Sequence, residues 1–272
     1  MEKKNEEAKR VYNNQHLNGF VEAIRKEQTK EGKPVYNITV CTKENFPGKE
    51  QPLNSYHNVV VFPQDKAVKG EKLSESLDGM MKALEAGETK RIALDGRLIY
   101  DKGMDTNKVV AKNSTIVFDP KGMKEGEAHN RLDFVGRVAS IDKKNDGFVT
   151  LSVIGHDPVY GKDRKVDHYT DTPVRVAVND KGQSAGLYKA IEEGKVKVGD
   201  QIALNGQLHN NNFEKGEAKK FQYQLAPRGF EVLKVAAEKK EVKAEVKAEK
   251  KPAAKKTEPK KAVSRKKAPK IA

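Results

Sequence analysis

The chain has 272 residues, which is long enough for two ordinary domains, and a net charge of +14. The charge is unevenly placed, because residues 239–272 hold 14 Lys and Arg against 4 Glu. This distribution indicates a polyanionic partner such as nucleic acid. No apolar run approaches the roughly 20 residues of a membrane span, and no signal peptide is visible. No membrane partner is therefore expected. The single cysteine, Cys41, excludes an internal disulfide framework and suits a reducing cytoplasm.

A segment of seven residues with the pattern Ile-Ala-Leu-x-Gly-x-Leu occurs twice, at residues 92–98 and 202–208. Alternating apolar residues predict a strand with one buried face, and the Gly marks a bend or bulge. Two copies at matching places in two similar halves indicate one small β-rich unit that is used twice.

The first unit is predicted to contain three strands, one helix and two further strands. Alternating and β-branched residues predict the strands, and apolar residues at helical spacing, ended by Gly87, predict the helix. The predicted strands are residues 17–24, 35–40, 56–62, 89–100 and 114–118, and the predicted helix is 74–86. Residues 43–54 and 101–112 are predicted loops.

The second unit repeats this plan, with Gly136 in the place of Gly19 and Gly194 in the place of Gly87. Asn145-Asp146-Gly147 predicts a hairpin turn. The predicted strands are residues 132–141, 148–154, 173–178, 197–208 and 220–225, and the predicted helix is 185–193 with Ser184 as its N-cap. Residues 155–172 and 209–219 are predicted loops, and residues 226–229 are predicted to close the unit as residues 119–122 close the first.

Three strands, a helix and two strands is the element order of the OB-fold barrel. On this order, on the helix position and on the repeated pattern in the fourth strand, each half resembles the oligonucleotide-binding domain of single-stranded DNA-binding proteins. The resemblance implies an all-β fold of two tandem five-stranded Greek-key barrels, each with one helix between strands three and four. Gly19 and Gly136 fit a first strand that bends sharply to join both sides of such a barrel.

The predicted domains follow from this resemblance and from composition. They are a flexible leader (1–15), a first OB-fold domain (16–123), a linker (124–130), a second OB-fold domain (131–235) and a disordered Lys/Ala/Pro-rich tail (236–272). The tail departs from the bacterial members of this family, which typically end in an acidic tip. It resembles instead the basic tails of linker-histone-like proteins, and would add salt-sensitive phosphate binding.

The resemblance also implies that single-stranded DNA lies across the open sheet face and the hairpin loops. Such sites combine cations for the backbone with aromatic rings for the bases, each stacked base contributing about 1–3 kcal/mol. The candidate residues are Tyr36, Tyr56, Tyr100, Lys102, Lys108 and Lys112 in the first unit, and Tyr160, Lys162, Arg164, Lys165, Tyr169 and Phe213 in the second. For Tyr36 the strand face that it shares with Ile38 and Val40 favours the core, and the lysines also fit ordinary solvated side chains.

No motif indicates catalysis. A phosphate-binding loop and a nucleophile elbow are absent from the sequence, and the six histidines lack metal-ligand spacing, so no catalytic residue, metal or cofactor is expected. The expected function is that of a non-enzymatic single-stranded DNA-binding protein that coats and protects DNA during replication or recombination. It would act in the cytoplasm of a bacterial or phage-infected cell, associated with the nucleoid.

The expected partner is single-stranded DNA, with RNA as the alternative polymer. Replication or recombination proteins are candidate protein partners, and self-association stays open. The alternative function is that of a structural or packaging protein of a nucleoid or virion. Its barrels would then make protein contacts, and its basic tail would bind nucleic acid non-specifically.

Overall fold

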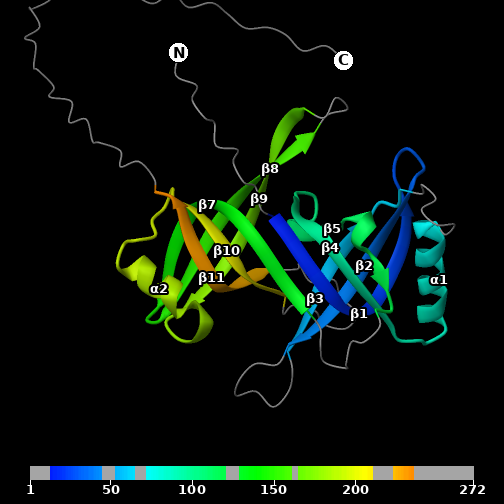
Figure 1. Ribbon diagram of the computed structural model, residues 1–272, viewed down its shortest axis with the longest axis horizontal. Helices are drawn as coiled ribbons and strands as arrows, with labels where there is room; N and C mark the ends of the chain where they lie inside the picture. Colours follow the sequence, from blue (N-terminus) through cyan, green and yellow to red (C-terminus); the bar gives the residue numbers. More distant parts are fainter. Residues whose placement is uncertain are drawn as a thin grey trace, which may run out of the picture. The chain divides into compact units, whose positions relative to one another are not determined.

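The computed structural model describes residues 13–44, 53–64, 72–120, 129–160, 165–210 and 223–235. All of them belong to one compact unit, residues 1–236. The first half holds β1 (Asn13–Gln28), β2 (Pro34–Glu44), β3 (Leu53–Val61), α1 (Leu73–Glu85), β4 (Lys90–Asp101), β5 (Thr106–Ala111), the 3-10 turn η1 (Asn113–Thr115) and β6 (Val117–Phe118) (Figure 1). The second half holds β7 (His129–Asn145), β8 (Phe148–Tyr160), β9 (Val166–Asn179), η2 (Gly182–Ser184), α2 (Ala185–Glu192), β10 (Gln201–His209) and β11 (Gln224–Lys234).

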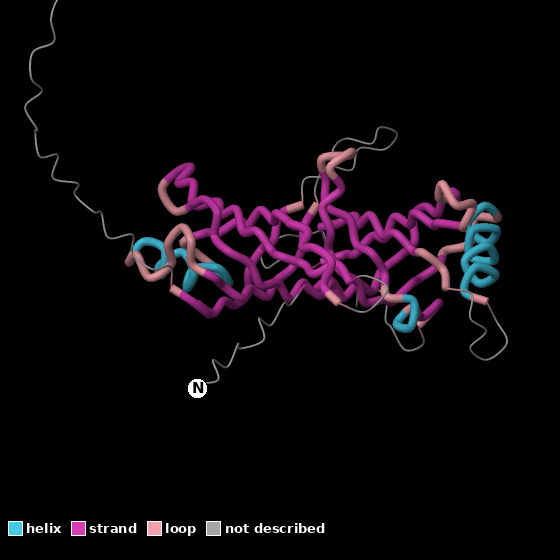
Figure 2. The backbone as a smooth tube through the Cα atoms, turned by 90° about the horizontal axis from the view of Figure 1, so that it is seen from above, coloured by secondary structure: helices cyan, strands magenta, loops and turns pink. Residues whose placement is uncertain are grey.

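The strands of each half close on themselves as a barrel. In the first half the order is β1-β2-β3-β5-β4 and back to β1, and only the β3–β5 pairing is parallel. In the second half the order is β7-β8-β9-β11-β10 and back to β7, and only β9–β11 is parallel. Figure 2 shows α1 and α2 at opposite ends of this unit, each beside its own barrel. The repeated pattern occupies β4 and β10, whose isoleucine and leucines are buried.

The first strand of each barrel changes partner at a glycine. Gly19 pairs with β4, and the next residue, Phe20, also pairs with Cys41 of β2. A Cβ atom at Gly19 would lie 2.4 Å from the carbonyl oxygen of Cys41, and one at Gly136 would lie 2.8 Å from that of Ile154. No side chain fits at this distance, so the predicted role of these glycines in joining both sides of a barrel agrees with the strand registers.

Both helices end as the sequence predicts. Gly87 and Gly194 have φ values of +83° and +69°, which L side chains rarely adopt. The amide of each glycine and the amide after it donate to carbonyls of the last helical turn, the arrangement of a Schellman motif. Ser184 occupies the N-cap position of α2, but its hydroxyl bonds the backbone of Asn179 rather than the helix.

The two barrels join through their first strands. β1 and β7 pair antiparallel, with Gln15 opposite Leu132, and these two residues each lie four positions before the partner-switching glycine. Equivalent residues therefore meet at an approximate two-fold axis. Asn13 and Asn130 make the same contacts on either side of it. Each amide donates to, and each amide oxygen accepts from, the backbone of the last leucine of the repeated pattern, at 2.7–3.2 Å.

A second set of contacts between the barrels is largely buried, with His57 fully buried and His209 half-buried. The Tyr223 hydroxyl accepts the backbone N–H of Asn58 at 2.7 Å, and the Tyr223 ring stacks on that of His57 at 6.2 Å. His209 lies 3.1 Å from the hydroxyl of Ser55. Burial lowers the pKa of His57 to about 3 and that of His209 to about 4. Both imidazoles are therefore neutral near pH 7.

The fifth strand of each half differs from the prediction. In the first half β5 lies inside the predicted loop 101–112, whereas residues 114–118 form η1 and the short β6. The polar start of β5 resembles a loop because it faces the other barrel, where Asn107 donates to the carbonyl of Pro173 at 2.9 Å. In the second half β11 begins at Gln224 and continues through the predicted closing turn. A register shift beside Gly206 accommodates Pro227 in this strand.

The predicted loop 155–172 is a two-stranded ribbon in its described part. β8 and β9 continue to pair from His156 opposite Asp171 to Tyr160 opposite Val166. The ribbon shows no hydrophobic alternation because residues 165–171 are exposed. The strands begin at Asn13 and His129, slightly before the predicted domain starts. The predicted leader up to residue 12 and the tail from residue 236 lie outside the described residues. Neither described α-helix is long and apolar enough to cross a membrane.

Candidate nucleic-acid interface

Four strands of the first barrel bring one row of side chains onto the outward sheet face. Phe20 of β1 lies opposite Arg91 of β4 and Cys41 of β2, and Cys41 lies opposite Tyr56 of β3. Their chain neighbours on β1, β2 and β3 are buried, as is Ile92 on β4, so these neighbours face inward. We call Arg91, Phe20, Cys41 and Tyr56 the Phe20 row.

Two cations lie over the ring at the centre of this row. The guanidinium carbon of Arg91 is 4.7 Å from the centroid of the Phe20 ring, and the ammonium of Lys43 is 5.3 Å from it. Such contacts are electrostatically favourable, and they hold both cations at the sheet surface. A row of this kind can place phosphates on the cations and bases on the rings of Phe20 and Tyr56.

Cys41 supports the row from beneath. Its side chain is 1% exposed, and burial raises the pKa of its thiol to about 11. The thiol is therefore protonated and unreactive at neutral pH, and Cys41 packs as a small hydrophobe between its cross-strand neighbours Phe20 and Tyr56. Burial also raises the pKa of Tyr56, whose half-exposed ring remains at the surface.

Further along β3, Phe62 directly follows the strand and is 46% exposed. It lies an even number of residues from Tyr56, and so on the same outward side of an extended chain. At about 3.3 Å per residue it lies roughly 20 Å along the chain from Tyr56, so it is an accessible ring apart from the row. Sequence reasoning did not select Phe62, nor Phe20, Lys43 and Arg91. One signal was available for Phe20, because it is an aromatic residue on the otherwise polar outward series of strand one, after Asn14, His16 and Asn18.

Tyr36 does not belong to the interface, and its assignment as a base-stacking residue is corrected. The side chain is 0% exposed. Its hydroxyl donates its one proton to Asp78 at 2.8 Å and lies 3.2 Å from the carbonyl oxygen of Ser74, and so ties β2 to α1. No base can reach this ring. Its strand face, shared with Ile38 and Val40, is the core face.

The hairpin between β4 and β5 brings three of the predicted residues together. The Tyr100 hydroxyl donates to the carboxylate of Asp105, and the Lys108 ammonium lies 2.7 Å from the Asp101 carboxylate. Lys102 is exposed at the tip of this hairpin, whereas Lys112 is exposed beyond the far end of β5. Two carboxylates thus offset the cations of the hairpin, and the role of these residues in nucleic-acid contact stays a prediction.

In the second half the predicted residues fall on the ribbon or outside the described residues. Tyr169 is 57% exposed, and its ring meets that of His156 edge-on at 6.2 Å. Lys165 is exposed just before β9 begins. The backbone of Tyr160 ends β8, but its side chain is not described. Lys162, Arg164 and Phe213 lie outside the described residues.

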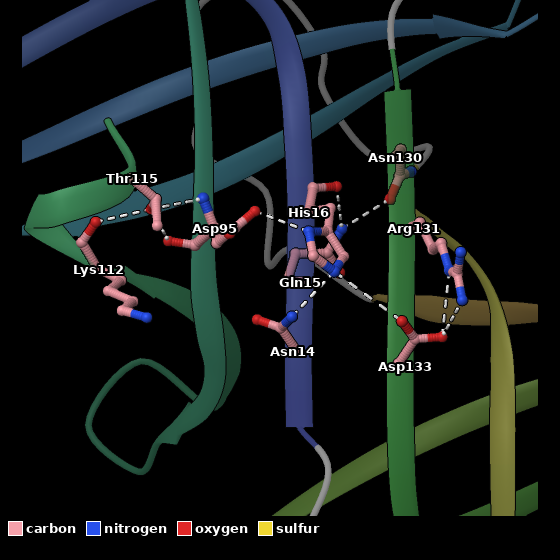
Figure 3. Close-up of polar contacts among 9 residues, drawn as sticks. All are labelled: Asn14, Gln15, His16, Asp95, Lys112, Thr115, Asn130, Arg131 and Asp133. Carbon is pink, nitrogen blue, oxygen red and sulfur yellow. Dashed lines mark hydrogen bonds and ion pairs between the residues drawn. The ribbon is translucent and has the colours of Figure 1, made fainter. Parts of the chain in front are cut away.

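The outward face of the junction between the barrels carries a polar network that spans three strands (Figure 3). His16 of β1 lies between Asp95 of β4, at 2.7 Å, and Asp133 of β7, at 3.9 Å. Arg131 pairs with the same Asp133 at 3.0 Å, and Asn14 lies 2.9 Å from the second nitrogen of His16. These contacts connect the barrels, and the two carboxylates make this face a poor place for phosphates. Within the described parts of the chain, no group of three or more His, Cys, Asp or Glu side chains could hold a metal ion.

Comparison with known proteins shows which solved structures share this architecture. No protein-family model matches the sequence, and no curated protein matches it. The wild-type single-stranded DNA-binding protein from Thermus aquaticus matches in structure with a TM-score of 0.53 and 15% identity, over 84% of this chain and 96% of that chain. A deletion mutant of the same protein matches with a TM-score of 0.53 and 16% identity, over 85% of this chain and 98% of that one. The chain has the tandem OB fold.

The likeness covers both barrels of the OB fold, and at this identity it concerns the fold alone. It confirms the predicted all-β class and the resemblance on which that prediction was based. The OB fold explains why the helix of each half lies between the third and fourth barrel strands. The function of the Phe20 row must be argued from its own chemistry.

Proposed function

We propose that this chain binds single-stranded DNA without catalysing a reaction on it, and that it coats and protects the strand during replication or recombination. The observation that carries the proposal is the Phe20 row. It presents an aromatic ring, two cations over that ring and a second ring on one outward sheet face. We place this activity in the cytoplasm of a bacterial or phage-infected cell, at the nucleoid.

The chemistry of the row favours an unpaired strand over a duplex. A ring stacks on the face of a base, and in a duplex both faces are already covered by neighbouring base pairs. Stacking accepts any base, because every base has a π face, so sequence preference should be slight. The cations attract the backbone whichever base follows.

Two further features support the proposal. The solved structures that share the fold over almost their full length are of a protein named for binding single-stranded DNA. Residues 239–272 are strongly basic, which would add phosphate contacts of low specificity. DNA is the preferred polymer of the proposal, and RNA of the same length is the comparison in its test.

The test separates the barrels from the tail. Residues 1–236 form a compact unit with its own core, so a protein shortened to end at Val235 should fold. We expect it to bind a labelled oligo-dT in fluorescence anisotropy about tenfold or more tightly than a duplex of equal length. Loss of single-strand binding on shortening, with full binding by the whole chain, would contradict the proposal. It would favour instead a packaging protein that contacts nucleic acid through its tail.

Salt dependence gives a second test of the same surface. Each phosphate contact to a single strand contributes about 0.7 to the slope of log affinity against log salt. Replacing Lys43 or Arg91 by Gln should therefore lower the slope by about that amount each. Lys181→Gln is the matched control, because Lys181 is exposed in the turn after β9, away from the row. Equal effects of all three substitutions would show that the row makes no specific contact.

A further inference from the structure

The two barrels differ at the positions that form the Phe20 row. The strand registers define which residues correspond. Gly19 and Gly136 are both the places where a first strand changes partner, so Phe20 corresponds to Arg137. The cross-strand pairs then identify the remaining counterparts: Ile154 for Cys41, Pro173 for Tyr56 and Gln201 for Arg91.

The counterpart row in the second barrel contains no aromatic ring. Its central residue, Arg137, is exposed and can hold a phosphate. Its neighbours Ile154 and Pro173 are half-buried and offer no flat π face for a base. The same sheet position therefore supports stacking and phosphate contact in the first barrel, but phosphate contact alone in the second.

The ribbon of β8 and β9 only partly replaces the stacking surface that the second barrel lacks. Its exposed ring, Tyr169, lies on the same strand as two acidic residues, Asp167 and Asp171. Asp171 pairs with His156, and Asp167 lies 3.0 Å from His168. All four of these side chains are more than half exposed. Exposed carboxylates repel the phosphates that flank any base stacked on Tyr169. The ribbon is thus a weaker first contact for a polynucleotide than the Phe20 row.

We propose that the two barrels act unequally on one strand, an inference that rests on the proposed function. The first barrel is the primary site, where bases stack on the Phe20 row. The second barrel adds phosphate contacts at Arg137 and joins only when the strand is long enough to occupy both barrels. Arg137 at the position of Phe20 is the residue that makes the second barrel secondary.

The test compares a short and a long oligo-dT on the full chain. An oligonucleotide of about eight nucleotides matches one OB barrel, whose site sizes run from about 4 to 16 nucleotides. We expect isothermal titration to give one tight site per chain for the short strand. Phe20→Leu, which keeps an apolar cover over Cys41, should lower its affinity about tenfold, whereas Arg137→Gln should lower it less than about threefold. For a strand several times longer, the two losses should become comparable.

A gain-of-function variant tests the role of Arg137 directly. Arg137→Phe places a ring at the counterpart position, and should raise the number of tight sites for the short strand from one to two. Two equal sites in the natural chain, or a larger loss with Arg137→Gln than with Phe20→Leu, would overturn the inference while leaving the proposed function intact. Failure of the natural chain to prefer single strands over duplex would instead reject the proposed function itself. Circular dichroism of each variant checks that it is folded.

Discussion

Lowering the pH should destabilise the folded protein, because two histidines lie between its barrels with little access to water. His57 is fully buried against the ring of Tyr223, and His209 lies at the hydroxyl of Ser55. Burial is the main cause that lowers the pKa of His57, with a smaller contribution from His209. Burial likewise lowers the pKa of His209, with a smaller contribution from Arg228. The hydroxyl of Thr42 and the ring of Tyr223, which contact His57, carry no negative charge that would stabilise an imidazolium.

The direction in which stability changes with pH follows from proton linkage. Both folded-state pKa values, about 3 and about 4, lie below the ordinary value of 6.5. Below pH 6.5 the unfolded chain therefore binds more protons than the folded chain. The stabilisation by neutral, buried histidines is complete above pH 6.5, and it is lost as the pH falls toward the folded-state pKa values.

The magnitude at pH 5 depends little on how low the folded-state pKa values are. At that pH both folded-state imidazoles are still mostly neutral, so each histidine costs about 1.4 kcal/mol per pH unit below 6.5, or about 2 kcal/mol. Together they lower the free energy of unfolding by about 4 kcal/mol between pH 8 and pH 5. For a domain of this size about 1 kcal/mol corresponds to roughly 2–4 °C, so Tm should fall by about 8–16 °C.

Thermal unfolding followed by circular dichroism at several pH values between about 8 and 5 measures this effect. This window isolates histidines, because carboxyl groups have unfolded-state pKa values near 4. His57→Gln, whose amide can still bond Thr42, should remove about half of the pH dependence. His168→Gln on the exposed ribbon controls for the substitution itself. A Tm that changes by less than about 3 °C across the window, or an unchanged slope in His57→Gln, would refute the reasoning.

Three further predictions concern the scaffold. Gly19→Ala should destabilise the fold by about 1–3 kcal/mol in urea unfolding, because its Cβ would lie 2.4 Å from a carbonyl oxygen. Gly79→Ala is the control: a Cβ at Gly79 meets open space on α1, so this substitution should stabilise the fold by about 0.5–1 kcal/mol. Tyr36→Phe should lower stability by about 1 kcal/mol through its lost hydrogen bonds and leave DNA affinity unchanged, and a loss of affinity would reinstate it as a contact residue. Asn130→Ala should lower Tm more than Asn13→Ala, because Asn130 is 4% exposed and its bonds to Leu208 are buried, whereas Asn13 and its bonds to Leu98 are partly exposed and water can replace them; equal losses would contradict this.

The sequence predicted those parts of the fold that depend on local chemistry. The strand pattern of β4 and β10, the capping glycines Gly87 and Gly194, and the Asn-Asp-Gly turn between β7 and β8 each have a signal within a few residues. Strand five had no such signal. The polar residues Thr106 and Asn107 are buried, and Asn107 bonds the carbonyl of Pro173 in the other barrel.

The candidate site shows the same limit. Tyr56 was found from the sequence, because it starts a strand rich in valine. Phe20, Arg91 and Lys43 come from three other strands, and they meet only because β1 changes partner at Gly19. Nothing in the spacing of these residues along the chain indicates this meeting, since it depends on the registers of two strand pairs, β1–β2 and β1–β4. Tyr36 was the opposite case, because its own strand alternation already indicated the core.

The residues that the two halves share, and those in which they differ, occupy different parts of the barrels. Equivalent residues are identical where the backbone demands it: Gly19 and Gly136 at the close approach, and Asn13 and Asn130 at the last leucine of the repeated pattern. They differ where the chain faces solvent, as at Phe20 and Arg137. Folding alone does not require an aromatic ring flanked by two cations on an outward sheet face, because a polar side chain there would leave the barrel core intact. The asymmetry of the outward faces therefore fits the proposal that the two barrels bind one strand unequally.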